Sequence, residues 1–196
     1  MLYGKYVVNL HKFYEFVGDD EDENRNRNVD MDNRIQLSKD EIIYGFVISC
    51  IEDVADVLGL DYLEVYRMMC GENMIYGYII PNYEVLHSES RKNVTDGLID
   101  TLNRWKGGEV VATGIGIRDR AMSGDLQRKV RNIIRWQRIG CIVVKISENM
   151  NVSLKEALDM FYKSETCRRF HDEETGLYLH GNLYVLNDFL AEMSAF

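Results

Sequence analysis

The chain has 196 residues, of which 46% are hydrophobic and 28% are charged, and its formal net charge is −9. This composition is typical of a soluble globular protein with one domain or two small ones, and the acidic balance argues against general coating of nucleic acid. No apolar run approaches the roughly 18 residues of a membrane-spanning helix, and the N-terminus lacks the pattern of a signal peptide, so a cytoplasmic protein is expected.

The N-terminal segment, residues 1–37, contains a run rich in aspartate and asparagine that predicts a solvated acidic loop. Before this loop, residues 5–10 have the aromatic and β-branched composition of a short strand. The linker, residues 109–125, begins with a second such stretch at residues 109–117. We expect the two stretches to pair as a minor two-stranded β element.

The first helical unit, residues 38–108, begins with a capping box. In Ser38-Lys-Asp-Glu41, the serine oxygen can accept from the third helical amide while the Glu41 side chain reaches back. Apolar residues then recur at helical spacing, which predicts a helix with a broad buried face. Gly59 suits the left-handed position after this helix, and Asp61 is a suitable N-cap for the next one.

The second helical unit, residues 126–196, shows the same order of features. A shift of 92 positions aligns Gly59 with Asn151 and Asp61 with Ser153. Each pair keeps its physical role, because glycine and asparagine tolerate a positive φ and aspartate and serine both cap helices. We therefore expect a mainly α protein of two related helical units; the alternative is two unrelated helical hairpins with similar caps.

Each unit is expected to contain an irregular segment that crosses its helices, at residues 74–87 and 167–180. Both segments contain aromatic residues, among them Tyr76, Tyr78 and Tyr83 in the first and Tyr178 in the second, and both end in Leu-His. The leucines, Leu86 and Leu179, are predicted to be buried, and the histidines are predicted to bond a backbone carbonyl or cap a helix. Such tyrosines suit core packing, but tyrosines are also frequent in interaction hot spots. The candidate partner-binding residues are therefore Tyr76, Tyr78, Tyr83, His87, Tyr178 and His180.

A basic stripe interrupts the acidic chain. Its four arginines are spaced three, four and three residues apart, so they lie on one face of a predicted helix. Three interpretations are open, in decreasing order of preference: a solvated face, a contact with an acidic protein, and a contact with nucleic acid. The residues are Arg128, Arg131, Arg135 and Arg138.

Catalytic and cofactor-binding patterns are not evident, and we expect neither an enzyme nor a cofactor. Cys167, His171 and His180 include two residues on one helical face, but a metal site needs further convergent ligands. Neither a Ser-His-Asp pattern nor a Cys-His pattern stands out. The pair Gly114-Ile-Gly116 lacks the third glycine of a dinucleotide loop.

The segment Tyr78-Ile-Ile-Pro-Asn-Tyr-Glu-Val-Leu-His87, followed by Val94-x-Asp96, resembles a bacterial family of small helical domains of unknown function. Its members read roughly Tyr-Ile-Ile-Pro-x-Tyr-Asp-Val-Leu-His-Thr-Gln-Gly, and the resemblance covers about residues 40–103. Ser88-Glu89-Ser90 replaces the Thr-Gln-Gly turn, so no role of that turn is carried over. Residues 153–193 more loosely resemble a second small helical family.

Genes for both families often lie near genes for ADP-ribosyltransferase-like proteins. The resemblance therefore implies a non-enzymatic accessory or antitoxin-like protein of the bacterial cytoplasm, with a partner protein encoded nearby. It carries over no catalytic residue, because none is established for the family. The alternative function is a nucleic-acid-binding regulator that uses the arginine stripe.

Overall fold

The computed structural model describes residues 36–107 and 126–195, with side chains described from Val130 onward in the second range. Both ranges are mainly helical, as predicted, and they contain no strand. The predicted β element lies outside the described residues, as do the linker and most of the N-terminal segment. Among the described helices, none has the length and apolar character needed to cross a membrane.

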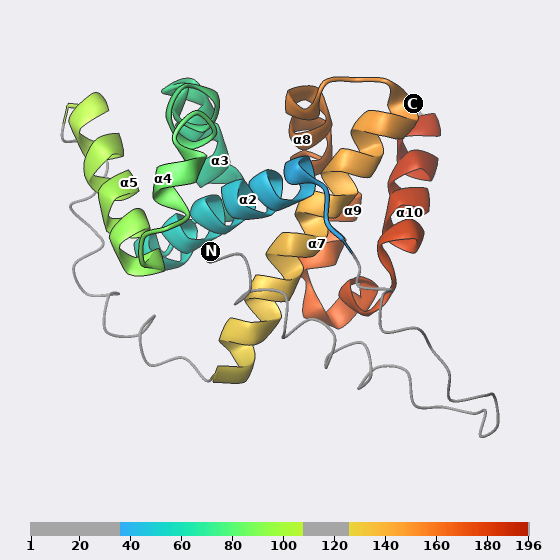
Figure 1. Cartoon of the computed structure of the whole chain (residues 1–196). Coiled ribbons are helices and arrows are strands. Elements are labelled where there is room, and N and C mark those ends of the chain that lie inside the picture. The colour runs from blue at the N-terminus through green and yellow to red at the C-terminus, as the bar shows by residue number, and fades with distance from the viewer. Residues whose placement is uncertain (1–35, 108–125, 196) are drawn as a thin grey trace. The chain divides into compact units, whose positions relative to one another are not determined.

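Two long helices, α2 (Lys39–Leu58) and α7 (Leu126–Met150), form the most extensive helix pair of the described fold (Figure 1). They approach closely because glycines meet at their contact: a Cβ atom added to Gly140 would lie 2.5 Å from the backbone nitrogen of Gly45. Gln137 reaches across the same contact and donates a hydrogen bond of 3.0 Å to the carbonyl oxygen of Glu41.

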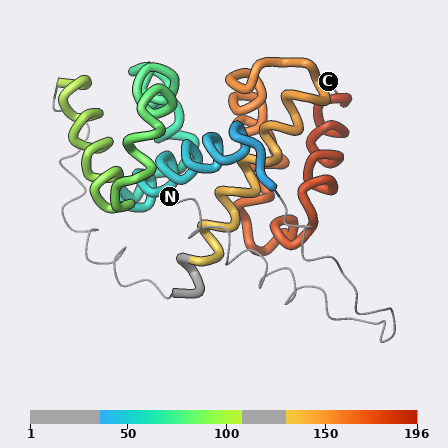
Figure 2. Tube along the Cα trace, viewed as in Figure 1, coloured from blue at the N-terminus to red at the C-terminus, as the bar shows by residue number. Residues whose placement is uncertain are grey.

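The other helices are arranged around this pair (Figure 2). In the first half of the chain, α2 packs against α3 and α5. In the second half, α7 packs against α8 and α10, and α9 also packs against α8 and α10. The elements of the first half are α3 (Tyr62–Gly71), the π-helical turn η1 (Ile75–Ile79), α4 (Tyr83–Leu86) and α5 (Arg91–Trp105). The elements of the second half are α8 (Leu154–Tyr162), α9 (Glu165–His171), the 3₁₀ turns η3 (Glu173–Thr175) and η4 (Leu177–Leu179), and α10 (Asn182–Ser194).

One hydrophobic core joins both halves. Ile48 and Ile51 of α2, Ile142 of α7, Phe161 of α8 and Phe189 of α10 are fully buried in the same cluster. Burying a side chain of this size contributes roughly 1.5–3 kcal/mol, so the shared core ties the two halves together. The helices from Leu37 onward accordingly form one compact unit. The origin of the halves by duplication stays a prediction.

The predicted caps are present at the corresponding turns of both halves. Gly59 and Asn151 both adopt the left-handed conformation, with φ of 66° and 52°. Asp61 caps α3 by accepting a hydrogen bond of 2.8 Å from the Leu63 amide. Ser153 forms a full capping box at the start of α8. Local sequence therefore determines where these helices begin and end.

Replacing Ser153 by alanine is expected to lower the free energy of unfolding by about 1 kcal/mol, because the amide of Glu156 loses its acceptor. Urea unfolding measures this difference. Ser194→Ala is a matched control at the exposed end of α10, where the hydroxyl bonds only a carbonyl of its own helix. That variant should stay within about 0.5 kcal/mol of the wild type. Equal losses for the two variants would contradict a capping role for Ser153.

The two crossing segments differ from the expectation. The first is largely helical, with η1 followed by α4, and Leu86 is only partly buried at the edge of the core. The prediction for Leu179 is wrong, because 64% of its surface is exposed. The buried leucine of the second segment is Leu177. The reason is the 3₁₀ geometry of η4: three residues complete a turn, so positions 177 and 179 point in different directions.

Candidate functional site

The candidate residues of the first crossing segment are all partly buried, and each packs against another side chain. The Tyr83 ring stacks on His87 with 4.6 Å between ring centroids, and His87 Nδ1 lies 2.7 Å from the Tyr83 carbonyl oxygen. The predicted bond from this histidine to a backbone carbonyl is therefore confirmed. Tyr78 packs edge-on against Trp105 at 6.1 Å. The Tyr76 ring lies under the Lys155 ammonium at 4.9 Å.

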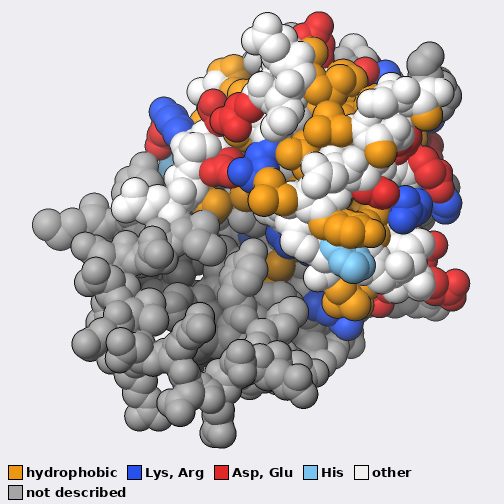
Figure 3. Space-filling view, turned by 90° about the vertical axis from the view of Figure 1, so that its right-hand side faces the viewer, with side chains coloured by type: hydrophobic (Ala, Val, Ile, Leu, Met, Phe, Trp, Pro, Cys, Tyr) orange, Lys and Arg blue, Asp and Glu red, His pale blue; other side chains and the backbone are white. Residues whose placement is uncertain are grey.

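The end of the second crossing segment and the start of α10 expose several apolar side chains. Leu179, Leu183 and Tyr184 expose 64%, 65% and 54% of their surface. His180 is also exposed, and its ring stacks on Tyr184 with 4.3 Å between centroids. We call these four residues the C-terminal apolar surface. Figure 3, a view onto the side of the C-terminal helices, shows hydrophobic side chains gathered around a histidine.

The predicted arginine stripe does not form one free surface. All four arginines lie on α7, and the side chain of Arg128 is outside the described residues. Arg131 is exposed, whereas Arg135 is partly buried and donates a hydrogen bond of 2.9 Å to Asn132 Oδ1. The environments differ along the helix, because Arg138 lies against α9, η4 and the start of α10, whereas Arg131 is exposed.

Arg138 instead has a structural role beneath the C-terminal apolar surface. Its Nε donates a hydrogen bond of 2.8 Å to Asn182 Oδ1, and its two terminal nitrogens donate to the carbonyl oxygens of Tyr178 and His180. The guanidinium also lies 5.0 Å from the centre of the Phe170 ring. Arg138 therefore joins α7 to the backbone on either side of Leu179.

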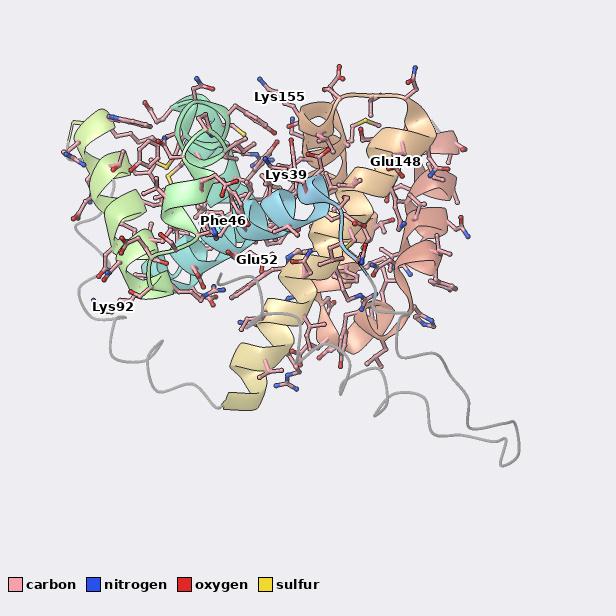
Figure 4. All side chains as sticks on the ribbon, in the orientation of Figure 1. Lys39, Phe46, Glu52, Lys92, Glu148 and Lys155 are labelled. Atoms are coloured by element: carbon pink, nitrogen blue, oxygen red, sulfur yellow. The ribbon has the colours of Figure 1, made fainter. Side chains whose placement is uncertain are left out.

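A buried charged cluster lies where α2, α7 and α9 meet. Glu52 of α2, labelled in Figure 4, is 6% exposed. Its Oε1 lies 2.7 Å from His171 Nε2, and its Oε2 accepts a hydrogen bond of 2.8 Å from Trp136 Nε1. The His171 ring stacks on Tyr62 with 4.0 Å between centroids. We call Glu52 and His171, which are 119 positions apart, the buried ion pair.

Cys167, His171 and Glu52 contact one another in the order of a nucleophile, a base and an acid that orients the base. The Cys167 sulfur lies 3.6 Å from His171 Nδ1, but the same nitrogen lies 2.9 Å from the Cys167 carbonyl oxygen. With a carbonyl oxygen at one ring nitrogen and a carboxylate at the other, the imidazole is best satisfied as a cation that donates twice. Cys167 is also fully buried, so the geometry suits a charge pair within the core.

The titration of both partners supports an ion pair. Burial opposes ionisation of Glu52, but the charge and hydrogen bond of His171 outweigh it, so the Glu52 pKa lies below its ordinary value of 4.5. Burial also disfavours the His171 cation, but the Cys167 sulfur and the Glu52 carboxylate outweigh this. The pKa of His171 is therefore well above its ordinary value of 6.5. Both groups are charged between these two ordinary values.

The buried ion pair is expected to contribute its full stabilisation between pH 4.5 and pH 6.5. The contribution of Glu52 is lost as pH falls below 4.5 and through its lowered pKa, because the unfolded state takes up a proton before the folded state does. The contribution of His171 is lost as pH rises above 6.5 and through its raised pKa, because the unfolded state releases its proton before the folded state does. Urea unfolding below, within and above this range, for the wild type and a Glu52→Gln, His171→Gln double variant, measures both losses.

The difference between the two pH profiles isolates the ion pair from other titrating groups. Burial raises the pKa of Asp53 to about 6 despite the neighbouring Arg91. The Glu52 charge is only the smallest cause of this shift, so most of the Asp53 contribution to the pH dependence is common to both proteins. Parallel profiles for the wild type and the double variant would contradict the prediction.

The three residues considered as metal ligands from the sequence do not lie together. Cys167 and His171 are adjacent, but His180 lies on the C-terminal apolar surface. Within residues 36–107 and 126–195, no group of three or more His, Cys, Asp and Glu side chains is arranged to hold a metal ion.

A small pocket lies between η1, α4 and α5. Its volume is about 220 Å³, and we call it the Gly97 pocket. Of the residues around it, the sequence interpretation proposed only Tyr78 as a candidate binding residue. Gly97 could have pointed to this pocket from the sequence. A glycine within a helix lowers helix stability by about 1 kcal/mol relative to alanine, so its presence there calls for an explanation. The lining residues are Tyr78, Leu86, Glu89, Asn93, Val94, Gly97 and Leu98.

Comparisons with known proteins identify one family in this part of the chain. The model of the family described as "Protein of unknown function (DUF3791)" matches residues 45–105. A search of the curated proteins and a search of the solved structures found no significant match. The matched segment runs from α2 to the end of α5 and contains the Gly97 pocket. Residues 45–105 are therefore similar to a family of small helical domains of unknown function.

Proposed function

We propose that the chain is a non-enzymatic interaction module that binds another protein through the C-terminal apolar surface. The observation that carries the proposal is the exposure of Leu179, Leu183 and Tyr184 on successive turns of one segment. Single exposed apolar residues are common, but neighbouring ones mark interaction sites. Tyrosine is enriched in binding hot spots, because its ring buries a large area while its hydroxyl stays hydrated.

The rigidity of this surface supports the proposal. Arg138 binds the carbonyl oxygens of Tyr178 and His180, which flank Leu179, and it also binds Asn182 at the start of α10. Hydrogen bonds from a charged group are stronger than those between neutral groups. A segment held in this way loses little conformational entropy when a partner binds, so more of the contact energy appears as affinity.

The enclosure of the Cys167–His171–Glu52 cluster supports a binding role over a catalytic one. A nucleophile needs access to its substrate, and Cys167 is fully buried. His171 also directs its ring nitrogens at a carbonyl and a carboxylate, which leaves it poorly placed to accept a proton from the thiol.

We further propose that the partner is an ADP-ribosyltransferase-like protein encoded nearby in a bacterium, and that the chain acts in the cytoplasm as its accessory or antitoxin-like partner. This part of the proposal rests on the resemblance of the Tyr78–His87 motif. The family match of residues 45–105 is compatible with it, since that family has no assigned function.

The alternative of a nucleic-acid-binding regulator has less support. Arg138 directs its donors at the chain's own carbonyl oxygens, and Arg135 is partly buried. Binding through the stripe would weaken steeply with salt and would fall when Arg131 is replaced by glutamate.

Co-purification from the native host tests the leading proposal. The tagged wild type should recover one stoichiometric protein, and a Leu183→Ser, Tyr184→Ser variant should lose it. Both substituted side chains are exposed, so the variant is expected to fold. Arg67→Ser is a matched control at an exposed position of α3. A wild type that runs alone, or a partner retained equally by all three proteins, would overturn the proposal.

A further inference from the structure

The Gly97 pocket opens onto a helix position that the described fold leaves uncovered. Gly97 lies within α5 and is exposed, and a Cβ atom added to it would have no described atom within 4 Å. A glycine in a helix interior lowers helix stability relative to alanine. At this position, packing among the described residues gives no reason for a glycine.

The chain shows elsewhere what a glycine within a helix permits. At Gly140, a Cβ atom would meet the backbone of Gly45 at 2.5 Å, so the glycine allows α2 and α7 to approach closely. Gly97 presents the same bare backbone to a pocket instead of a helix. This contrast points to an occupant that approaches the α5 backbone from outside.

The size and walls of the pocket indicate which occupant fits. Its volume of about 220 Å³ is below the roughly 300–1,000 Å³ of small-molecule sites, but above the roughly 150 Å³ of a cavity that binds benzene. It therefore suits one large apolar side chain. Leu86, Val94 and Leu98 supply aliphatic walls, and Tyr78 supplies a ring. Trp105, which packs on Tyr78 and is 46% exposed, extends the apolar rim.

The charge at the rim further limits the occupant. Glu89 is the charged residue among those that line the pocket, and no ion pair within the described residues involves it. The nearby cations are already paired, Arg91 with Asp53 and Lys92 with Asp96. One Glu89 oxygen, Oε2, accepts a long hydrogen bond of 3.4 Å from Asn93 Nδ2, a neutral donor that leaves the charge of the carboxylate unpaired. The Glu89 carboxylate can therefore pair with a cation that the occupant carries.

We propose that the Gly97 pocket binds one leucine or phenylalanine side chain from a partner protein's helix, with a lysine or arginine one turn away that pairs with Glu89. The inference rests on the proposed function in requiring a protein partner. It adds a second contact on α4 and α5, built from residues other than those of the C-terminal apolar surface.

Peptide selection tests this inference without knowledge of the partner. Random peptides displayed on phage are selected on the full chain, and the enriched peptides are expected to combine leucine or phenylalanine with a basic residue three or four positions away. In solution, such a peptide should shift the amide resonances of Gly97 and Val94. Gly97→Leu should weaken it about tenfold or more by filling the pocket, and Glu89→Gln should remove the preference for the basic residue.

Gly71→Leu is the matched control, because it adds the same side chain at an exposed helix position with no described atom within 4 Å. It should leave peptide affinity unchanged. Peptides that bind the Gly97→Leu variant as tightly as the wild type would overturn the inference. A lowered melting temperature of the isolated Gly97→Leu variant would also overturn it, since a segment of the same chain would then occupy the pocket.

The outcomes separate this inference from the proposed function. The native partner could be lost by the Leu183→Ser, Tyr184→Ser variant but fully retained by Gly97→Leu. That outcome would support the proposed function and show that the Gly97 pocket does not bind the partner. If the wild type recovers no partner, the proposed function itself is overturned.

Discussion

Glu52→Ala is expected to lower the free energy of unfolding by about 3–5 kcal/mol, which is typical when one partner of a buried ion pair is removed. The variant leaves His171 buried without its counterion, after a contact of 2.7 Å in the wild type. It also leaves the Trp136 indole nitrogen without the carboxylate oxygen that accepts its hydrogen bond at 2.8 Å. Urea unfolding between pH 4.5 and pH 6.5, where both groups are charged, measures the loss.

Two controls show whether the loss arises from the pair. Glu64→Ala removes an exposed glutamate from α3 and should change stability by no more than about 0.5 kcal/mol. A Glu52→Leu, His171→Leu double variant should regain part of the loss, because apolar residues often replace a buried pair at little cost. If Glu52→Ala loses less than about 1 kcal/mol, the carboxylate is not held in the buried pair that the structure shows.

Gly140→Ala is expected to lower the free energy of unfolding by about 3 kcal/mol, at the upper end of the usual cost of overpacking. The added Cβ atom would lie 2.5 Å from the Gly45 nitrogen, 2.9 Å from the Gly45 Cα and 3.0 Å from the Glu41 carbonyl oxygen. All three atoms belong to the backbone of α2, so no side-chain rotation relieves the clash. The helices must separate, which weakens the core between them and the hydrogen bond from Gln137 to Glu41.

The same substitution in α5 is the matched control. Gly97→Ala meets no described atom within 4 Å and should raise the free energy of unfolding by about 0.5–1 kcal/mol, through helix propensity alone. For Gly45→Ala, the three atoms nearest to the added Cβ all belong to the flexible side chain of Gln137, so its effect should lie between the other two. Equal stabilities for Gly140→Ala and Gly97→Ala would show that α2 and α7 do not cross as closely as the structure indicates.

Local signals in the sequence predicted the helices and their caps well. The capping box at Ser38, the positive φ of Gly59 and Asn151, and the caps at Asp61 and Ser153 are all confirmed. These features depend on interactions within about four residues, so residue type and spacing are sufficient to identify them. The mainly α class follows for the same reason.

The roles of single polar and apolar residues were harder to predict. Leu179 was expected to be buried, but the 3₁₀ turn buries Leu177 and exposes Leu179. Arg138 belongs to a regular stripe by spacing, yet it bonds carbonyl oxygens about 40 residues later in the chain. Helical periodicity identifies a shared face, but it does not show which element packs against that face.

The sequence by itself determined the helical class, the turns between helices and the resemblance of one segment to a family of unknown function. The tertiary structure alone decided that Glu52 meets His171, that Gly140 meets Gly45, and that Gly97 faces an open pocket. The first set depends on contacts between near neighbours in the chain. The second set depends on how α2 crosses α7 and α9. These crossings are determined by the close packing of the whole core, in which residues that are distant in the chain come into contact. Both proposed binding sites belong to the second set, since exposure and rigidity appear only after the core has formed.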